Sequence, residues 1–305
     1  MTHPGRPLVT FALFAYNQEK YIREAVEGAF AQTYQPLEII LSDDCSSDRT
    51  FEIMQEMAAG YTGPHDVRVR RSVANNGLLS HINGAVSIAR GQIVIMAAGD
   101  DISFPFRTTL TVNAFLARPE TMAIFTKSSE LPPRLDYCFA DLKCISPLRI
   151  ALGGGGVGMG AAYSYKRDCF NCPELLPENL YSEDRILPMR AAILGLVGFV
   201  DVSTISHRDT PDSITKKLGN QRLFSYENVQ HLDFLSMDVR ALYSGSMTWK
   251  GRLILLLIRL RIVMAKNSNN VTIKWVLDKL ILRVTSKLIH ILHFEKSIPV
   301  KVKAL

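Results

Sequence analysis

Two pairs of aspartates each follow directly on a run of apolar residues. Asp43 and Asp44 come after residues 39–41, and Asp100 and Asp101 come after residues 93–96. Runs this rich in Ile, Leu and Val indicate buried parallel strands, and the carboxyl ends of such strands are where open α/β sheets bind ligands. Carboxylate oxygens suit a hard divalent cation. The pattern therefore predicts one crevice, lined by four carboxylates, that would accept a nucleotide and a metal.

A third acidic pair, Glu183 and Asp184, opens a predicted helix. A carboxylate within reach of a hydroxyl group can act as a general base. Acidic residues are also favoured at helix amino-termini by the helix dipole alone, so the pair by itself does not decide between the two interpretations.

The elements that must position these carboxylates alternate between strand and helix, which is typical of βαβ units and a largely parallel sheet. Asn17 is the predicted cap of the first helix, whose apolar stripe runs from Ile22 to Phe30. Strands are predicted at residues 8–14, 38–41, 67–69 and 92–97, with helices ending near residues 30, 58 and 89 between them.

Beyond residue 105 the pattern is looser. Residues 128–150 show no clear period, and the glycine-rich residues 153–160 are interpreted as a mobile lid or acceptor loop. Helices are predicted at residues 109–116, 184–194 and 223–243, and extended segments at 122–125, 161–165 and 198–205.

Composition bounds the class of protein. The chain has 305 residues, of which 47% are hydrophobic, enough for one large α/β domain or two smaller ones. We expect no signal peptide, because no cationic region precedes a long apolar run, and no membrane-spanning segment. Five cysteines, an odd number, favour a reduced, cytoplasmic compartment. Only Cys169 and Cys172 have metal-ligand spacing, so buried thiols are favoured over a zinc site.

The charge is unevenly distributed. Residues 246–305 contain 12 Lys and Arg against two acids, a charge of +10, so the remainder of this +6 chain carries 6 − 10 = −4. Lys279, Arg283, Lys287 and His290 share one predicted helix face opposite an apolar one, with Trp275 nearby. This pattern favours a basic amphipathic extension lying on an anionic membrane surface. The alternative is that these helices pack on the catalytic domain or on another copy of it.

Several ordered stretches of the chain resemble the inverting, nucleotide-sugar-dependent family 2 glycosyltransferases, which have the GT-A fold. No single stretch would suffice, but their order and spacing over roughly residues 8–215 are specific. The stretches are AYNQEKYIREAVEGAFAQTY (15–34), SDDCSSDRT (42–50), NNGLLSHINGAVSIARGQIV (75–94), AAGDDISFPFR (97–107), GAAYSYKRDCF (160–170), SEDRILPMR (182–190) and HRDTPDSIT (207–215).

The resemblance implies a nucleotide-sugar site. In it Asp44 would accept a hydrogen bond from a uracil-type base, and the ring of Tyr16 would stack on that base. The competing interpretation makes Asp43, Asp44 and Asp48 turn formers or helix caps. The nucleotide-binding residues implied by the resemblance are Ala15, Tyr16, Asn17, Asp43, Asp44, Asn76, Gly77, Asp100 and Arg208.

The resemblance also implies that Asp101 holds Mg²⁺ or Mn²⁺ against the donor diphosphate, and that Asp100 binds either the ribose or the same metal. The chain departs from the commonest form of this acidic motif, because Ala98 stands where its first aspartate would be. In the last matched stretch Thr210 stands where the family has a histidine, and His207 where it has a tyrosine. His207 could reach the site, but we favour the interpretation as a surface histidine. Arg208 is interpreted as a ligand of diphosphate oxygens or the partner of a nearby acid.

Glu183 and Asp184 match the catalytic acidic pair of the family, in which the aspartate deprotonates the acceptor hydroxyl. The chain is therefore expected to contain a GT-A catalytic domain at 1–215, with nucleotide-sugar binding in 8–107 and the acceptor and base region in 108–215. Residues 216–305 form the helical extension.

The expected function is transfer of a single sugar, from a UDP-sugar by preference, to a glycan or lipid-linked acceptor in bacterial-type surface polysaccharide or lipopolysaccharide synthesis. Localisation is expected on the inner face of the cell membrane, with no nucleic-acid partner and with homo-oligomerisation left open. The alternative is a catalytically impaired nucleotide- or glycan-binding scaffold, suggested by Ala98 and Thr210. A processive polysaccharide synthase is a weaker rival, because spanning helices and a Q-x-x-R-W motif are absent from the sequence.

Overall fold

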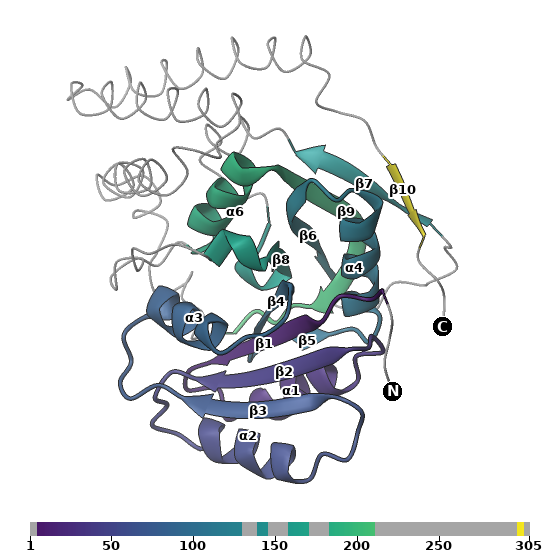
Figure 1. Ribbon diagram of the computed structural model, residues 1–305. Coiled ribbons are helices and arrows are strands. Elements are labelled where there is room, and N and C mark those ends of the chain that lie inside the picture. Colours follow the sequence, from purple (N-terminus) through teal and green to yellow (C-terminus); the bar gives the residue numbers. More distant parts are fainter. Residues whose placement is uncertain (1–4, 130–138, 146–157, 171–182, 211–297, 302–305) are drawn as a thin grey trace, which may run out of the picture.

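A computed structural model describes residues 5–129, 139–145, 158–170, 183–210 and 298–301 (Figure 1). These residues form one ten-stranded sheet with helices on both of its faces. The predicted helix at 223–243, the glycine-rich residues 153–157 and the predicted amphipathic helices of the tail lie outside the described residues.

The first half of the sheet is parallel and follows the predicted alternation. Its strands lie in the order β3-β2-β1-β4, and every neighbouring pair in it is parallel. This confirms the Rossmann-like sheet of the sequence analysis. In chain order the elements are β1 (Val9–Ala15), α1 (Ile22–Phe30), β2 (Leu37–Asp43), α2 (Thr50–Ala59), β3 (Asp66–Arg71), α3 (Leu78–Ser87) and β4 (Ile93–Ala98).

The second half of the sheet is mixed. β8 runs antiparallel between β4 and β6, while β6 and β9 are parallel with register shifts. The short strands β5, β7 and β10 were not predicted, and β10 pairs antiparallel with β7 near the end of the chain. The elements are β5 (Ile102–Ser103), α4 (Arg107–Ala117), β6 (Thr121–Ser129), β7 (Phe139–Ile145), β8 (Tyr163–Lys166), α6 (Glu183–Leu194), β9 (Leu196–Ser206) and β10 (Ile298–Lys301), with single 3₁₀ turns at η1 (Gly160–Ala162) and η2 (Arg167–Phe170).

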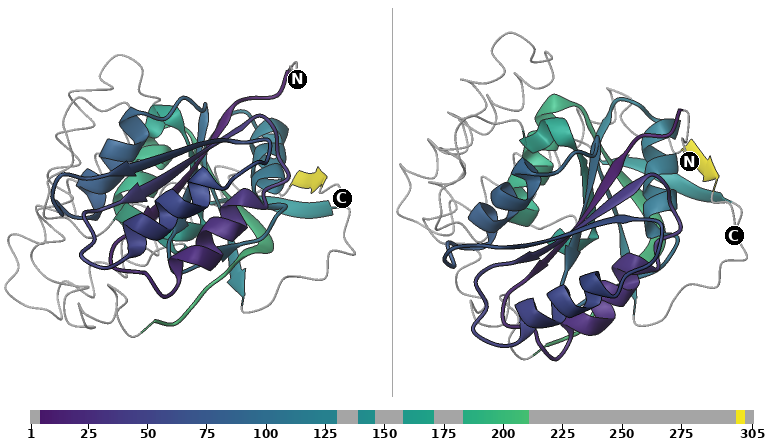
Figure 2. Two further views of the ribbon diagram at one scale, coloured as in Figure 1. Left: turned by 90° about the horizontal axis from the view of Figure 1, so that it is seen from below. Right: turned by 60° about the horizontal axis from the view of Figure 1, so that its bottom comes forward.

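Alternate residues of the central strands enter two separate cores. On β1, Phe11 and Leu13 pack with α1, α2 and α4, whereas Ala12 and Phe14 pack with α3 and α6. Figure 2 shows α1 and α2 side by side on one face of the sheet. Because the central strands are buried on both faces, their sequences are almost continuously apolar, as a covered parallel sheet requires.

The first helix begins later than the sequence analysis expected. α1 starts at Ile22, and Tyr21 precedes it without a side-chain cap. The prediction that Asn17 caps this helix is therefore wrong. Asn17 has a positive φ of 52°, and its side-chain Oδ1 accepts a hydrogen bond from the backbone N–H of Ser47 (2.9 Å). Its amide thus joins the turn after β1 to the turn after β2.

Candidate active site

The carboxyl ends of β1, β2 and β4 meet at one edge of the sheet. Ala15 on β1 lies opposite Asp43 on β2, and Phe14 lies opposite Ala98 on β4. The backbone N–H of Asp44 donates to the carbonyl of Ala15 (3.0 Å). Tyr16, Asp44 and the turn that holds Asp100 and Asp101 thus leave adjacent strands at the same edge, as the sequence analysis expected.

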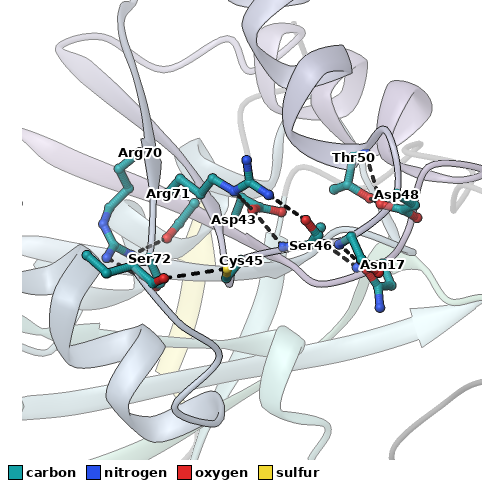
Figure 3. A network of polar contacts seen from close by, with 12 residues as sticks. Asn17, Asp43, Cys45, Ser46, Asp48, Thr50, Arg70, Arg71 and Ser72 are labelled. Carbon is teal, nitrogen blue, oxygen red and sulfur yellow. Dashed lines mark hydrogen bonds and ion pairs between the residues drawn. The ribbon is translucent and has the colours of Figure 1, made fainter.

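Asp43 stabilises the turn after β2. It is fully buried, its Oδ2 accepts from the backbone N–H of Ser46 (2.9 Å), and the same oxygen pairs with Nε of Arg71 (3.3 Å). Arg71 also donates to the carbonyl of Ser46 (2.5 Å), as Figure 3 shows. These contacts give Asp43 the turn-forming role that was weighed against nucleotide binding.

Asp44 is buried next to Asp43. It is 4% exposed, and its Oδ1, like Oδ1 of Asp43, has no hydrogen-bond partner among the described residues. Burial raises the pKa of Asp44 above its ordinary value, and the charge of Asp43 adds to this effect, while Ser72 and Arg70 oppose it. Next to this strand end the ring of Tyr16 is 47% exposed. The buried carboxylate of Asp44 and the exposed ring of Tyr16 thus follow neighbouring strands.

The third loop at this edge leads into α3. Gly77 precedes the helix with a φ of 86°, a conformation that favours glycine, and its N–H donates to Oδ1 of Asn75 (3.1 Å). Asn76 is exposed beside it. The predicted residues Asn76 and Gly77 therefore lie where a backbone turn opens a helix.

Asp100 and Asp101 lie in the turn after β4 and are held by the residues that follow β9. Oδ1 of Asp101 accepts from Nδ1 of His207 (2.9 Å) and from the backbone N–H of Arg208 (3.1 Å). Oδ2 of Asp100 accepts from Oγ1 of Thr210 (3.3 Å). The side chain of His207 is 44% exposed and still reaches the site, so its interpretation as a surface histidine was incomplete.

The guanidinium group of Arg208 contacts two side chains of the protein. It forms an ion pair with Glu24 of α1 and lies 5.7 Å from the centre of the Tyr21 ring. Of the two roles expected for Arg208, the structure shows the pairing with an acid.

A divalent cation would find few protein ligands here. Among the described residues, no three His, Cys, Asp or Glu side chains gather closely enough to hold a metal by themselves. Asp100 and Asp101 still fit a hard cation, because burial raises the pKa of Asp100 and the charge of Asp101 raises it further. A cation shared with phosphate oxygens would relieve that repulsion.

Glu183 and Asp184 begin α6, as expected. Burial and the charge of Asp184 raise the pKa of Glu183 to about 8. Oε1 of Glu183 lies so close to Gly160 that a Cβ at this glycine would approach it to 2.1 Å. At neutral pH Glu183 therefore keeps its proton, and Asp184 follows it in the first turn of the same helix.

A buried arginine joins the two acidic ends of the site. Arg107 is 1% exposed, and its Nη2 donates to the carbonyls of Met96 on β4 and Ala161 on η1, both at 2.6 Å. Ala161 adjoins the glycine that Glu183 touches. In the sequence, Arg107 was noted only as the last residue of a matched stretch. It follows an aspartate pair and begins the next helix, and a charged residue in that position is the signal that could have identified it.

Three of the five cysteines lie within the described residues. Cys144 and Cys169 are buried and Cys45 is partly buried, and all three are free thiols. Cys144 and Cys169 are thus buried thiols, as expected for these two residues. Cys138 and Cys172 lie outside the described residues.

None of the helices that the structure describes is both long and apolar enough to traverse a membrane.

Comparisons with known proteins agree with this geometry. Residues 10–132 match the family model described as glycosyl transferase family 2. The putative glycosyltransferase EpsE of Bacillus subtilis is 34% identical over 112 residues, which cover 37% of this chain and 39% of the relative. The chain spans only about two fifths of the curated relatives that it matches.

Solved structures share the fold. TarS of S. aureus, in complex with UDP-GlcNAc, superposes with a TM-score of 0.59 at 16% identity, covering 84% of this chain and 72% of that one. A mannosyltransferase from Pyrobaculum calidifontis, in complex with GDP-Man and Mn²⁺, gives a TM-score of 0.51 at 16% identity, covering 94% and 81%. At a sequence identity of 16%, the structural likeness to these two proteins establishes the GT-A fold.

Proposed function

Because residues 10–132 form a family 2 glycosyltransferase domain on a GT-A fold, we propose that the protein moves one sugar from a nucleotide-diphosphate sugar to a glycan or lipid-linked acceptor, with inversion at the anomeric carbon. UDP-sugars are the favoured donors, and surface polysaccharide or lipopolysaccharide synthesis of the bacterial type is the favoured setting. The observation that carries the proposal is the unpartnered, buried Oδ1 of Asp44 after β2, together with the exposed Tyr16 after the neighbouring strand β1.

These two residues suit a nucleobase. A buried carboxylate oxygen without a donor costs free energy that a ring N–H of uracil would recover, and a base stacked on Tyr16 would cover its aromatic face. Asp44 and Tyr16 follow neighbouring strands, so one base can contact both.

Asp100 and Asp101 would hold Mg²⁺ or Mn²⁺ together with the donor diphosphate, and the cation would neutralise charge on the leaving group. His207 and Thr210 would orient these carboxylates, since each already bonds one of them.

Asp184 is proposed as the general base. It would accept the proton of the acceptor hydroxyl while that oxygen bonds to the anomeric carbon and the bond from this carbon to the diphosphate oxygen breaks. Glu183 has a pKa of about 8 and so keeps its own proton at neutral pH, which makes it the less suitable base of the pair. One displacement of this kind inverts the anomeric centre.

The experiment starts with a panel of nucleotide sugars and thermal unfolding, because a ligand that binds the native state raises its apparent stability. The sugar donor found in this way is then tested for metal-dependent turnover. We expect Asp184→Asn to lower turnover about 10²- to 10⁴-fold, with donor affinity and fold unchanged. Asp201→Asn, on the surface of β9, is the control and should keep full activity.

The assignment of Asp184 fails if Asp184→Asn keeps wild-type turnover. The competing scaffold function is favoured by Ala98 at the end of β4, where a carboxylate would strengthen the metal site. Calorimetry that detects donor binding, combined with no product under Mg²⁺ or Mn²⁺, would support the scaffold.

The basic extension is proposed to bring the enzyme to an anionic membrane surface, where lipid-linked acceptors are found. This proposal rests on the charge of residues 246–305 and on the spacing of its cations.

A further inference from the structure

One buried imidazole near the nucleotide edge has no part in the chemistry described so far. His81 lies on α3 and is only 3% exposed. Its ring meets Phe14 of β1 edge-on, with 5.2 Å between centroids, and its Nε2 lies 2.6 Å from Oγ of Ser42 on β2. The helix that follows Gly77 is thus tied to two strands just before they release Tyr16 and Asp44.

The hydroxyl of Ser42 joins His81 to an arginine. Nη1 of Arg70, on β3, donates to Oγ of Ser42 at 2.6 Å. An arginine can only donate, so the hydroxyl accepts from Arg70 and is free to donate its own proton to Nε2 of a neutral imidazole. Burial, and then the charge of Arg70, lower the pKa of His81 to about 3, which keeps the ring neutral.

Arg70 is held close to the carboxylate proposed to bind the base. Its Nη2 donates to Oγ of Ser72 at 3.4 Å, and the side chain of Ser72 bonds to Asp44. The positive charge of Arg70 lowers the pKa of Asp44, against the effect of burial. Figure 3 shows Arg70 and Ser72 side by side at the end of β3.

We infer that His81 is a positioning residue for nucleotide binding, which acts through Ser42 to fix the guanidinium group of Arg70 beside Asp44. The inference rests on the proposed function, and the ligand that it concerns is the nucleoside diphosphate part of the donor. His81 itself does not touch the ligand. Its neutral nitrogen supplies the acceptor that completes the chain from α3 through β2 and β3 to the carboxylate.

The test measures the dissociation constant of UDP by calorimetry for the full chain and its variants. We expect His81→Leu and Ser42→Ala each to weaken UDP binding about tenfold, because Arg70 loses its fixed partner. His81→Gln, which keeps an acceptor near the position of Nε2, should restore most of the affinity. Where a sugar donor turns over, KM should rise while kcat stays within about twofold.

Two comparisons distinguish a positioning role of His81 in nucleotide binding from a purely structural role. His65 is a second buried histidine, far from this edge, whose Nε2 lies 2.8 Å from the carbonyl of Gln32. His65→Leu removes an equivalent buried imidazole, so it should lower stability without changing UDP affinity. The double variant, Ser42→Ala with His81→Leu, should bind UDP no more weakly than whichever single variant binds it more weakly. Both substitutions interrupt the same series of hydrogen bonds.

The inference is overturned if His81→Leu binds UDP within about twofold of wild type, if His65→Leu weakens binding as much, or if the two losses add. Ser42→Ala removes a single oxygen and decides the question if His81→Leu does not fold. If wild-type protein binds neither UDP nor another nucleoside diphosphate, the proposed function fails and the inference fails with it. Binding of UDP without turnover contradicts only the proposed reaction.

Discussion

Glu183 lies beside Asp184 in the first turn of α6, and burial together with the charge of Asp184 favours its protonated form. The raised pKa of Glu183, about 8, has a consequence for stability as well as for catalysis. Between pH 4.5, its ordinary pKa, and pH 8 the native state keeps a proton that the unfolded chain releases. The contribution of Glu183 to stability is therefore complete below pH 4.5 and is lost as the pH rises to about 8.

This predicts that Glu183→Gln becomes more stable relative to wild type between pH 5 and pH 8.5. Urea unfolding of both proteins at the two pH values measures the difference. Glu120→Gln is the matched control, because Arg118 lowers the pKa of Glu120 and its contribution changes only at lower pH. A constant difference between wild type and Glu183→Gln across the range would show that Glu183 ionises normally.

Single residues were predicted unevenly from the sequence. The aspartate pairs were found because each ends an apolar run, and a strand register then brings them to one edge. The separate tasks of Asp43 and Asp44 were not predictable, because they depend on Arg70, Arg71 and Ser46, which reach them from neighbouring segments. His207 was judged from its position in a motif, whereas its contact with Asp101 spans 106 residues of sequence.

At the scale of elements, Arg107 joins β4, β5 and η1 from the first turn of α4. Besides the carbonyls of Met96 and Ala161, it donates to Oγ of Ser103 (2.8 Å). Burial lowers its pKa to about 9, and the charge of Asp101 opposes that shift. The cost of burying this charge is offset by three hydrogen bonds and a nearby carboxylate.

We therefore expect Arg107→Met to lower the free energy of unfolding by about 2 to 4 kcal/mol, because two buried carbonyls lose their donor. Urea unfolding measures this loss. Arg49→Met provides a control, since the side chain of Arg49 is 69% exposed and should change stability by less than about 0.5 kcal/mol. A neutral outcome for Arg107→Met would mean that relief of the buried charge equals the lost hydrogen bonds.

The elements themselves were predictable where the pattern was local. The parallel half, from β1 to β4, has three apolar strands, an alternating strand β3 and amphipathic helices of ordinary length, so periodicity found each of them. In the second half, β7 lies in residues 128–150, which show no period, and β5 has only two residues. Such strands are formed by pairing with β9, a contact that local sequence does not encode.

For the molecule as a whole, the proposed membrane contact depends on the charge of residues 246–305. We expect the full chain to float with vesicles that contain anionic lipid and to be released by salt. Replacing Lys279, Arg283 and Lys287 by Ser should weaken this binding by about 1 kcal/mol for each cation. Equal binding of wild type and this variant, or binding to neutral vesicles, would contradict the electrostatic proposal.

The matched control neutralises three cations of the catalytic part. Arg23, Arg49 and Arg68 have exposed side chains outside the extension, so their replacement by Ser should leave vesicle binding unchanged. A division of the chain at residue 215 stays a prediction, to which the structure adds that residues 298–301 pair with β7.

The pairing of β10 with β7 gives the extension a second point of attachment. On one side the chain leaves the sheet at Thr210, which bonds to Asp100, and on the other it returns at Ile298 beside Leu142. A segment fastened at both ends restricts rotation far more than a single flexible tether does. Contact of this segment with a lipid surface would then fix the angle at which the proposed donor site faces that surface, and so select the acceptors whose reactive hydroxyl lies at a matching height.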